Sequence, residues 1–204
     1  VLHNQRRAGD DLALVGIGDL ALRWHTLAEG PVDDLGLSNT TTVAVAALDR
    51  GWTLYAHTEA RGATLDAAAD ASAAWTSLRD LHSHQISHGD LRAREITVAE
   101  GTALFGGFGN AEYGASDVQL QSDVAQLLVT TTALHGAQPA VAAAIDAFDA
   151  GTVLTASRRL SRTAMPQRLR RSVDDFKAVT SSARDEVKRQ TGADRIQSET
   201  ITRF

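Results

Sequence analysis

The stretch that most constrains the fold of this chain is residues 86–110, ISHGDLRAREITVAEGTALFGGFGN. The loop His88-Gly89-Asp90-Leu91 precedes two short apolar or β-branched runs, 96–98 and 103–105, which a Glu-Gly turn separates. Such runs on either side of a glycine turn predict a short antiparallel pair of strands. The glycine-rich exit 106–109 follows directly. Loop, strand pair and glycine exit at these intervals narrow the choice of fold far more than any one of them.

The rest of the chain predicts one hairpin before this segment and helices on both sides of it. We interpret Asp10 to Ala28 as a helix, although Gly16 and Gly18 weaken the pattern. Residues 40–48 and 52–57 flank a turn and predict a β-hairpin. Apolar periodicity predicts further helices over 66–84, 117–134, 139–148 and 167–190. The first of these has an apolar stripe along residues 71–81, and Gly192 is predicted to end the last. With its strands early and its helices late, the chain is expected to be α+β.

These motifs resemble the C-lobe of the protein-kinase-like superfamily over roughly residues 66–136. The catalytic loop of kinases reads H-R-D-L-x-x-x-N, and in several small-molecule kinases H-G-D, where the Asp orients the acceptor hydroxyl. The resemblance implies this position for Asp90, and it implies fold-structural roles for His88, Gly107, Phe108, Gly109 and Asp123. Asp123 would bond the backbone of the catalytic loop. The implied architecture is a protein-kinase-like fold, with a reduced N-lobe over 1–62, made of an αC-like helix and the hairpin, and a mainly helical C-lobe over 63–204.

Departures from the kinase pattern predict that phosphoryl transfer is lost. Glu95 replaces the Asn that holds magnesium, and Gly107 replaces the Asp of D-F-G. The first lysine of the chain is Lys177, so the lysine that grips the ATP phosphates has no counterpart in the small lobe. Asp90, Arg92 and Glu95 therefore occupy catalytic-loop positions in an expected pseudokinase that has no ATP or magnesium cofactor. The alternative is an atypical phosphotransferase that uses Asp90 and Glu95 with one metal ion.

Two other motifs invite site assignments that the sequence disfavours. Gly16-Ile17-Gly18 begins a weak match to a dinucleotide-binding loop, but no preceding strand or βαβ unit is predicted. His82, His84 and His88 could suggest a metal site, yet their spacing crosses from a helix end into a loop. We therefore expect neither a phosphate-binding loop nor a metal site.

Charge limits the choice of partners. The net charge is -5 and the pI about 5.8, so a nucleic-acid partner is not expected. Near the C-terminus lies a basic cluster, either a solvated face or a contact for an anionic membrane surface. Its members are Arg158, Arg159, Arg162, Arg168, Arg170 and Arg171.

A closer resemblance favours the membrane alternative. Residues 86–111, Ser116-Asp117, Ser122-Asp123 and the tail 189–203 look like the kinase-like cytoplasmic domain of actinobacterial lysylphosphatidylglycerol-synthase or flippase-like membrane proteins. In that family, membrane helices follow such a segment. The resemblance implies a module at the cytoplasmic face of the membrane, cut from a longer protein. Its partners would be the attached membrane domain, an anionic lipid or a regulatory protein. A stand-alone soluble scaffold is the third hypothesis.

Overall fold

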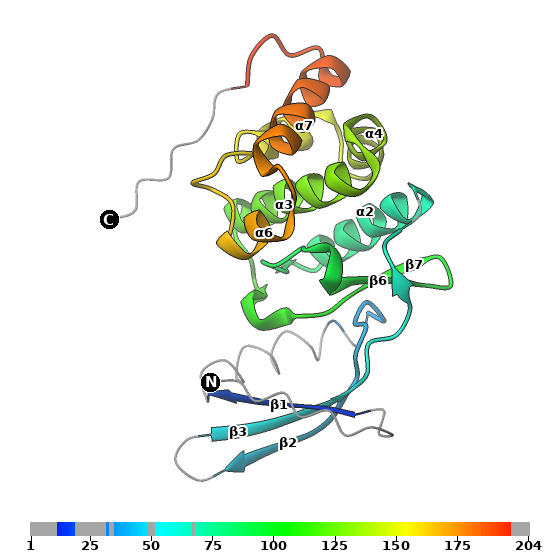
Figure 1. Ribbon diagram of the computed structural model, residues 1–204, viewed down its shortest axis with the longest axis vertical. Coiled ribbons are helices and arrows are strands. Elements are labelled where there is room, and N and C mark those ends of the chain that lie inside the picture. Colours follow the sequence, from blue (N-terminus) through cyan, green and yellow to red (C-terminus); the bar gives the residue numbers. More distant parts are fainter. Residues whose placement is uncertain (1–11, 19–31, 33–34, 49–51, 67, 197–204) are drawn as a thin grey trace.

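The chain folds into a strand-rich part followed by a helical part (Figure 1). This computed structural model describes residues 12–18, 32, 35–48, 52–66 and 68–196. The described residues form three small antiparallel sheets within the first 113 positions, with one α-helix between their strands, and the described chain beyond them is mainly helical. The α+β class predicted from the order of elements is confirmed.

The first sheet has the strand order β1-β3-β2. Its β2 (Thr42–Leu48) and β3 (Trp52–Thr58) form the predicted hairpin, with Leu48 opposite Trp52. The third strand, β1 (Leu12–Gly18), pairs antiparallel with β3.

The interpretation of Asp10 to Ala28 as a helix is wrong for residues 12–18, which form β1. Two glycines cost a helix about 1 kcal/mol each, and the β-branched Val15 and Ile17 favour an extended backbone. Pairing with β3 then supplies the hydrogen bonds that a helix would have made internally. The remainder of the predicted αC-like helix, 19–28, lies outside the described residues.

The strand pair predicted inside the signature segment is present as β6 (Ile96–Ala99) and β7 (Thr102–Phe105). At the turn between them, Glu100 and Gly101 have φ of 51° and 77°. Two positive φ angles in succession fit the tight turns that match the twist of a hairpin. The short strand β4 (Ala63–Thr64) extends this sheet beside β6. The strands β5 (Ile86–Ser87) and β8 (Glu112–Tyr113), which precede β6 and follow β7 in the sequence, pair with each other.

The helical part confirms most of the predicted helices. The confirmed helices are α2 (Ala68–Ser83), α3 (Asp117–His135) and α4 (Ala137–Ala147). The described chain also forms α5 (Ala150–Ser157), which was not predicted, followed by α6 (Gln167–Ser172) and α7 (Phe176–Thr191). α4 packs against α2, α3 and α7. Among the helices within the described ranges, none is long and apolar enough to cross a membrane.

The prediction of a single helix over 167–190 is wrong, because the segment forms two helices, α6 and α7, with a non-helical connection between them. Asp175 adopts φ 42°, outside the helical region, and its carboxylate accepts a hydrogen bond from the Ala178 N–H. It therefore caps a new helix rather than continuing the old one. The predicted stop at Gly192 is correct, since that residue has φ 71° and ends α7.

The core is centred on α2, which packs against the β6-β7 pair, α3 and α4. Trp75, Leu78 and Leu81 of α2 are fully buried, as are Leu127 and Leu128 of α3. The apolar stripe predicted along residues 71–81 is therefore confirmed as a core face.

A short segment ahead of the hairpin is hydrogen-bonded to β7. Phe105 N–H donates to the Leu37 carbonyl at 2.7 Å, and Asn39 N–H donates to the Phe105 carbonyl at 2.8 Å. Arg61 N–H then donates to the Asn39 carbonyl. Residues 37–39 thus supply a partner for the outer edge of β7, although they precede it by more than sixty positions. The division into lobes at residue 62 stays a prediction.

Candidate functional site

Asp123, in the second turn of α3, holds the backbone of the loop that carries the His-Gly-Asp motif. Its carboxylate is fully buried and accepts the N–H of His88 at 2.5 Å and the N–H of Gly89 at 2.8 Å. The ring of His82 lies 3.3 Å from the same carboxylate. Gly89 adopts φ 77°, and a Cβ there would collide with Asn110, so the turn requires glycine. Asp123 therefore anchors the backbone of this loop.

Two residues of α3 that the sequence did not single out continue this anchoring at Leu91. The Gln126 side chain accepts the Leu91 N–H at 3.3 Å, and the Thr130 hydroxyl donates to the Leu91 carbonyl at 2.6 Å. The positions 123, 126 and 130 lie on one face of a helix, because residues three to four apart are neighbours on its surface. This helical spacing from Asp123 is the signal by which Gln126 and Thr130 could have been predicted as further anchors of the loop.

His88 is buried and bonded through both ring nitrogens. Its Nε2 donates to the Gly106 carbonyl at 2.8 Å, while Nδ1 accepts the Asp90 N–H at 3.1 Å. This pattern requires a neutral ring, and burial lowers the pKa of His88 below its ordinary value. The ring also packs against Phe108, with centroids 4.8 Å apart. His88 thus joins the loop to the glycine-rich exit.

The carboxylate of Asp90 is occupied by Arg92. Arg92 donates from Nε to one oxygen at 2.6 Å and from Nη2 to the other at 2.5 Å. The same Nη2 also donates to Glu95 at 2.8 Å. Asp90 and Arg92 are both buried, and their hydrogen bonds raise the pKa of Arg92 above its ordinary value. The structure therefore brings the three predicted loop residues together as a closed ion-pair network.

Glu95 fills the space beside Gly107. A Cβ built on Gly107 would lie 2.5 Å from the Glu95 Oε2, and Gly107 adopts φ 72°. Arg94 holds Glu95 from the solvent side, through a hydrogen bond of 2.8 Å. The carboxylate at position 95 therefore stands where a side chain at position 107 would begin. Glycine at 107 and glutamate at 95 fit each other sterically.

Replacing Gly107 by alanine is expected to lower the free energy of unfolding by about 2–3 kcal/mol, from left-handed strain and from collision with Glu95. Gly101→Ala is the matched control, because Gly101 has a similar φ of 77° but no atom near its Cβ position. In a Glu95→Ala background, the cost of Gly107→Ala should fall to that of the control. Urea denaturation of the parent, Gly107→Ala, Gly101→Ala, Glu95→Ala and the double variant at 95 and 107 measures these costs. Equal costs of Gly107→Ala in both backgrounds would contradict the steric fit.

The three histidines that could suggest a metal site have separate partners. His82 contacts Asp123, His84 lies 2.9 Å from the Asp80 carbonyl, and His88 contacts the Gly106 carbonyl. Among the residues that the structure describes, no group of three or more His, Asp or Glu side chains could hold a metal ion. The weak phosphate-loop match at 16–18 lies at the end of β1, and residues 19–21 lie outside the described ranges.

The predicted arginine cluster divides into two sets. Arg162, Arg170 and Arg171 line a pocket of about 670 Å³ between the α5–α6 connection, α6 and α7, whereas Arg158, Arg159 and Arg168 do not. Arg159 is buried, and Arg158 and Arg168 are exposed. Lys177 and Arg184 of α7 add to the pocket lining, and the sequence had not grouped them with the cluster. They were missed because they belong to the next helix and line the same pocket only through the packing of α7.

Comparisons with known proteins support the fold assignment. No protein-family model matches the chain, and no curated protein matches it. Among solved structures, an amicoumacin kinase in complex with AMP-PNP, Ca²⁺ and Ami is similar, with a TM-score of 0.58 and 11% identity, over 93% of this chain and 88% of that one. At this identity the similarity shows the fold alone. The chain thus has a protein-kinase-like fold with a reduced N-lobe and a helical C-lobe, while the closer lysylphosphatidylglycerol-synthase or flippase-like resemblance stays a prediction.

Proposed function

We propose that this chain is a catalytically inactive kinase-like module that regulates or scaffolds an attached membrane protein from its cytoplasmic face. In this role it binds a partner protein or an anionic lipid head group rather than transferring phosphate. The observation that carries the proposal is the bidentate contact between Arg92 and Asp90, with bonds of 2.6 and 2.5 Å. A catalytic Asp must receive the acceptor hydroxyl, but here an internal guanidinium holds both of its oxygens.

The charge balance around the loop supports the same proposal. Arg92 and Arg94 offset the charges of Asp90 and Glu95, so the group as a whole has no net charge. A magnesium ion in a phosphoryl-transfer site is held by carboxylate or amide oxygens that are free to face it. Gly107, at the position of the D-F-G aspartate, has no side-chain oxygen that could bind the ion.

One observation favours the alternative, an atypical phosphotransferase. Glu95 Oε2 lies within 2.5 Å of the Cβ position of residue 107, so a carboxylate remains close to the place that the missing D-F-G aspartate would occupy. If Arg92 turned toward a bound phosphate, Asp90 and Glu95 could share a single metal ion.

Adding ATP with magnesium or manganese separates the two functions, because a ligand of the native state raises the melting temperature by mass action. For the inactive module we expect no shift beyond that caused by ATP or metal alone. The phosphotransferase predicts a metal-dependent rise that Asp90→Asn with Glu95→Ala removes. Comparing each variant with and without ligand keeps any change in intrinsic stability out of the result. A rise of this kind would contradict the inactive module.

A further inference from the structure

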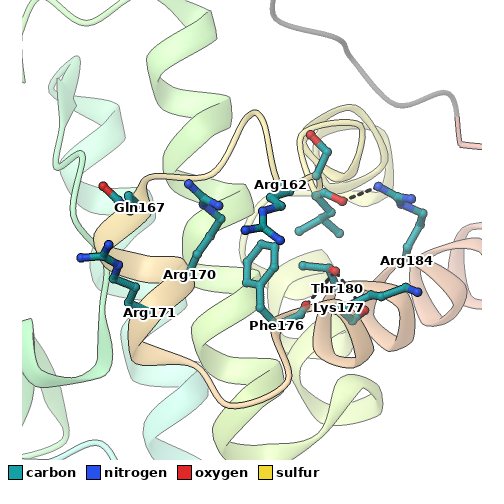
Figure 2. Close-up of a pocket in the computed structure, with 10 residues that line it drawn as sticks. Arg162, Gln167, Arg170, Arg171, Phe176, Lys177, Thr180 and Arg184 are labelled. Atoms are coloured by element: carbon teal, nitrogen blue, oxygen red, sulfur yellow. Dashed lines mark hydrogen bonds between the residues drawn. The ribbon is translucent and has the colours of Figure 1, made fainter.

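The pocket between the α5–α6 connection, α6 and α7 is strongly cationic (Figure 2). Arg162 comes from the connection, Arg170 and Arg171 from α6, and Lys177 and Arg184 from α7. No acidic residue belongs to the lining. In the described part of the chain, none of these five side chains forms an ion pair with a carboxylate. Three elements therefore contribute cationic side chains to the lining of one pocket, and the described part of the chain contributes no acidic residue to that lining.

Two of these arginines also have unused hydrogen-bond donors. The Nε of Arg170 and the Nε of Arg184 are buried, and within the described ranges neither has a hydrogen-bond partner. Another donor of Arg184, Nη2, bonds the Leu160 carbonyl and so orients the side chain, as the dashed line in Figure 2 shows. Buried donors in native proteins are nearly always satisfied, by protein, water or ligand. Such donors on guanidinium groups suit an anion with several acceptor oxygens.

The remaining lining limits the kind of anion. Phe176 and Leu160 contribute an aromatic ring and an aliphatic side chain, and Thr180 and Gln167 contribute polar groups. A volume of about 670 Å³ falls within the range of small-molecule pockets, and it exceeds the size of a bare phosphate ion. The chemistry therefore matches a phosphate group attached to a larger body.

We propose that this pocket binds a phosphate ester, with the phosphate among the arginines and the attached body against Phe176 and Leu160. The phosphate can belong to a soluble metabolite or to the head group of a phospholipid. The site rests on the binding role in the proposed function, since it would supply that role with a ligand. It does not involve Asp90, Arg92 or Glu95, so the two proposals can fail separately.

The test compares two variants of equal charge change in the full chain. Arg162→Gln with Arg171→Gln removes two exposed cations from the pocket, and Arg158→Gln with Arg168→Gln removes two exposed cations outside it. Neither pair removes a hydrogen bond that the fold uses in the described residues, so both variants should remain folded. Binding is measured by titration calorimetry with pyrophosphate in the absence of divalent metal, and by co-sedimentation with phosphatidylglycerol vesicles against phosphatidylcholine vesicles.

We expect the pocket variant to bind pyrophosphate at least about tenfold more weakly than the parent chain, and the outer variant to change affinity less than about twofold. Arg170→Gln should weaken binding in the same way as the pocket pair. Binding to phosphatidylglycerol vesicles that pyrophosphate competes away assigns the head group as the source, and pyrophosphate binding without vesicle binding assigns a soluble ester. Absence of binding to both ligands would overturn the proposal. So would an equal loss in the two variants, which would indicate diffuse surface charge. Asp90→Asn should leave pyrophosphate binding unchanged, so this result stays separate from the test with ATP.

Discussion

Asp123→Ala is expected to lower the free energy of unfolding by about 3–5 kcal/mol, the largest effect of a single substitution that we predict in this chain. The substitution leaves the buried N–H group of His88 and the partly buried N–H group of Gly89 without an acceptor. It also removes the acidic partner of the buried His82 ring. Denaturation in urea, monitored by tryptophan fluorescence, measures the change.

Two further variants separate the anchoring role of Asp123 from a general effect of lost charge. Asp117→Ala removes an exposed carboxylate from the first turn of the same helix and should cost less than about 1 kcal/mol. Asp123→Asn keeps one carbonyl oxygen for the loop and should fall between the parent and Asp123→Ala. If Asp117→Ala and Asp123→Ala proved equally costly, the loop would not depend on Asp123.

Arg92→Ala is expected to cost about 3 kcal/mol, because it leaves the Asp90 carboxylate buried without a cation. Arg94→Ala is the matched control, since Arg94 contacts the same Glu95 but is largely exposed, and it should cost no more than about 0.5 kcal/mol. Removing the stranded charge with Asp90→Asn should recover part of the loss caused by Arg92→Ala. Equal costs for Arg92→Ala and Arg94→Ala in urea denaturation would show that the buried pair contributes nothing beyond a surface contact.

The same variants bear on the proposed function. Residues that are held for chemistry often reduce stability, so that replacing them leaves a protein equally or more stable. A carboxylate kept as part of a structural ion pair behaves in the opposite way. Destabilisation by Asp90→Asn alone would therefore support the inactive module, and stabilisation would favour the phosphotransferase.

The sequence predicted the site region well where its signals were local. The strand pair after the loop, the burial of the α2 face and the end of α7 at Gly192 follow from turn residues and apolar periodicity, and all three are present. The kinase resemblance also implied a helix in which Asp123 faces the loop. These features depend on residues close together in the chain or on a pattern typical of the fold.

The predictions were wrong or incomplete where the outcome depends on a distant partner, or on side-chain geometry that has no periodic pattern. Residues 12–18 form a strand because β3 pairs with them. The seven residues themselves do not indicate that this partner exists. The break between α6 and α7 depends on Asp175, whose own side chain caps the new helix. The ion-pair network of Asp90, Arg92 and Glu95 spans only six residues. It could not be predicted because an irregular loop lacks the periodic spacing from which side-chain contacts in helices and strands are inferred.

The attachment of residues 37–39 to β7 has a consequence for folding during synthesis. Ribosomes add about 5–20 residues per second, so Asn39 exists for several seconds before Phe105, its hydrogen-bond partner, leaves the exit tunnel. Until then residues 37–39 lack their hydrogen-bonding partner in β7. Closing the loop between them costs chain entropy, which the contacts formed with β7 must offset. The outer edge of β7 therefore depends on residues that precede it by more than sixty positions. Residues 37–39 and the outer edge of β7 therefore reach their final hydrogen bonding together, after β7 has been synthesised.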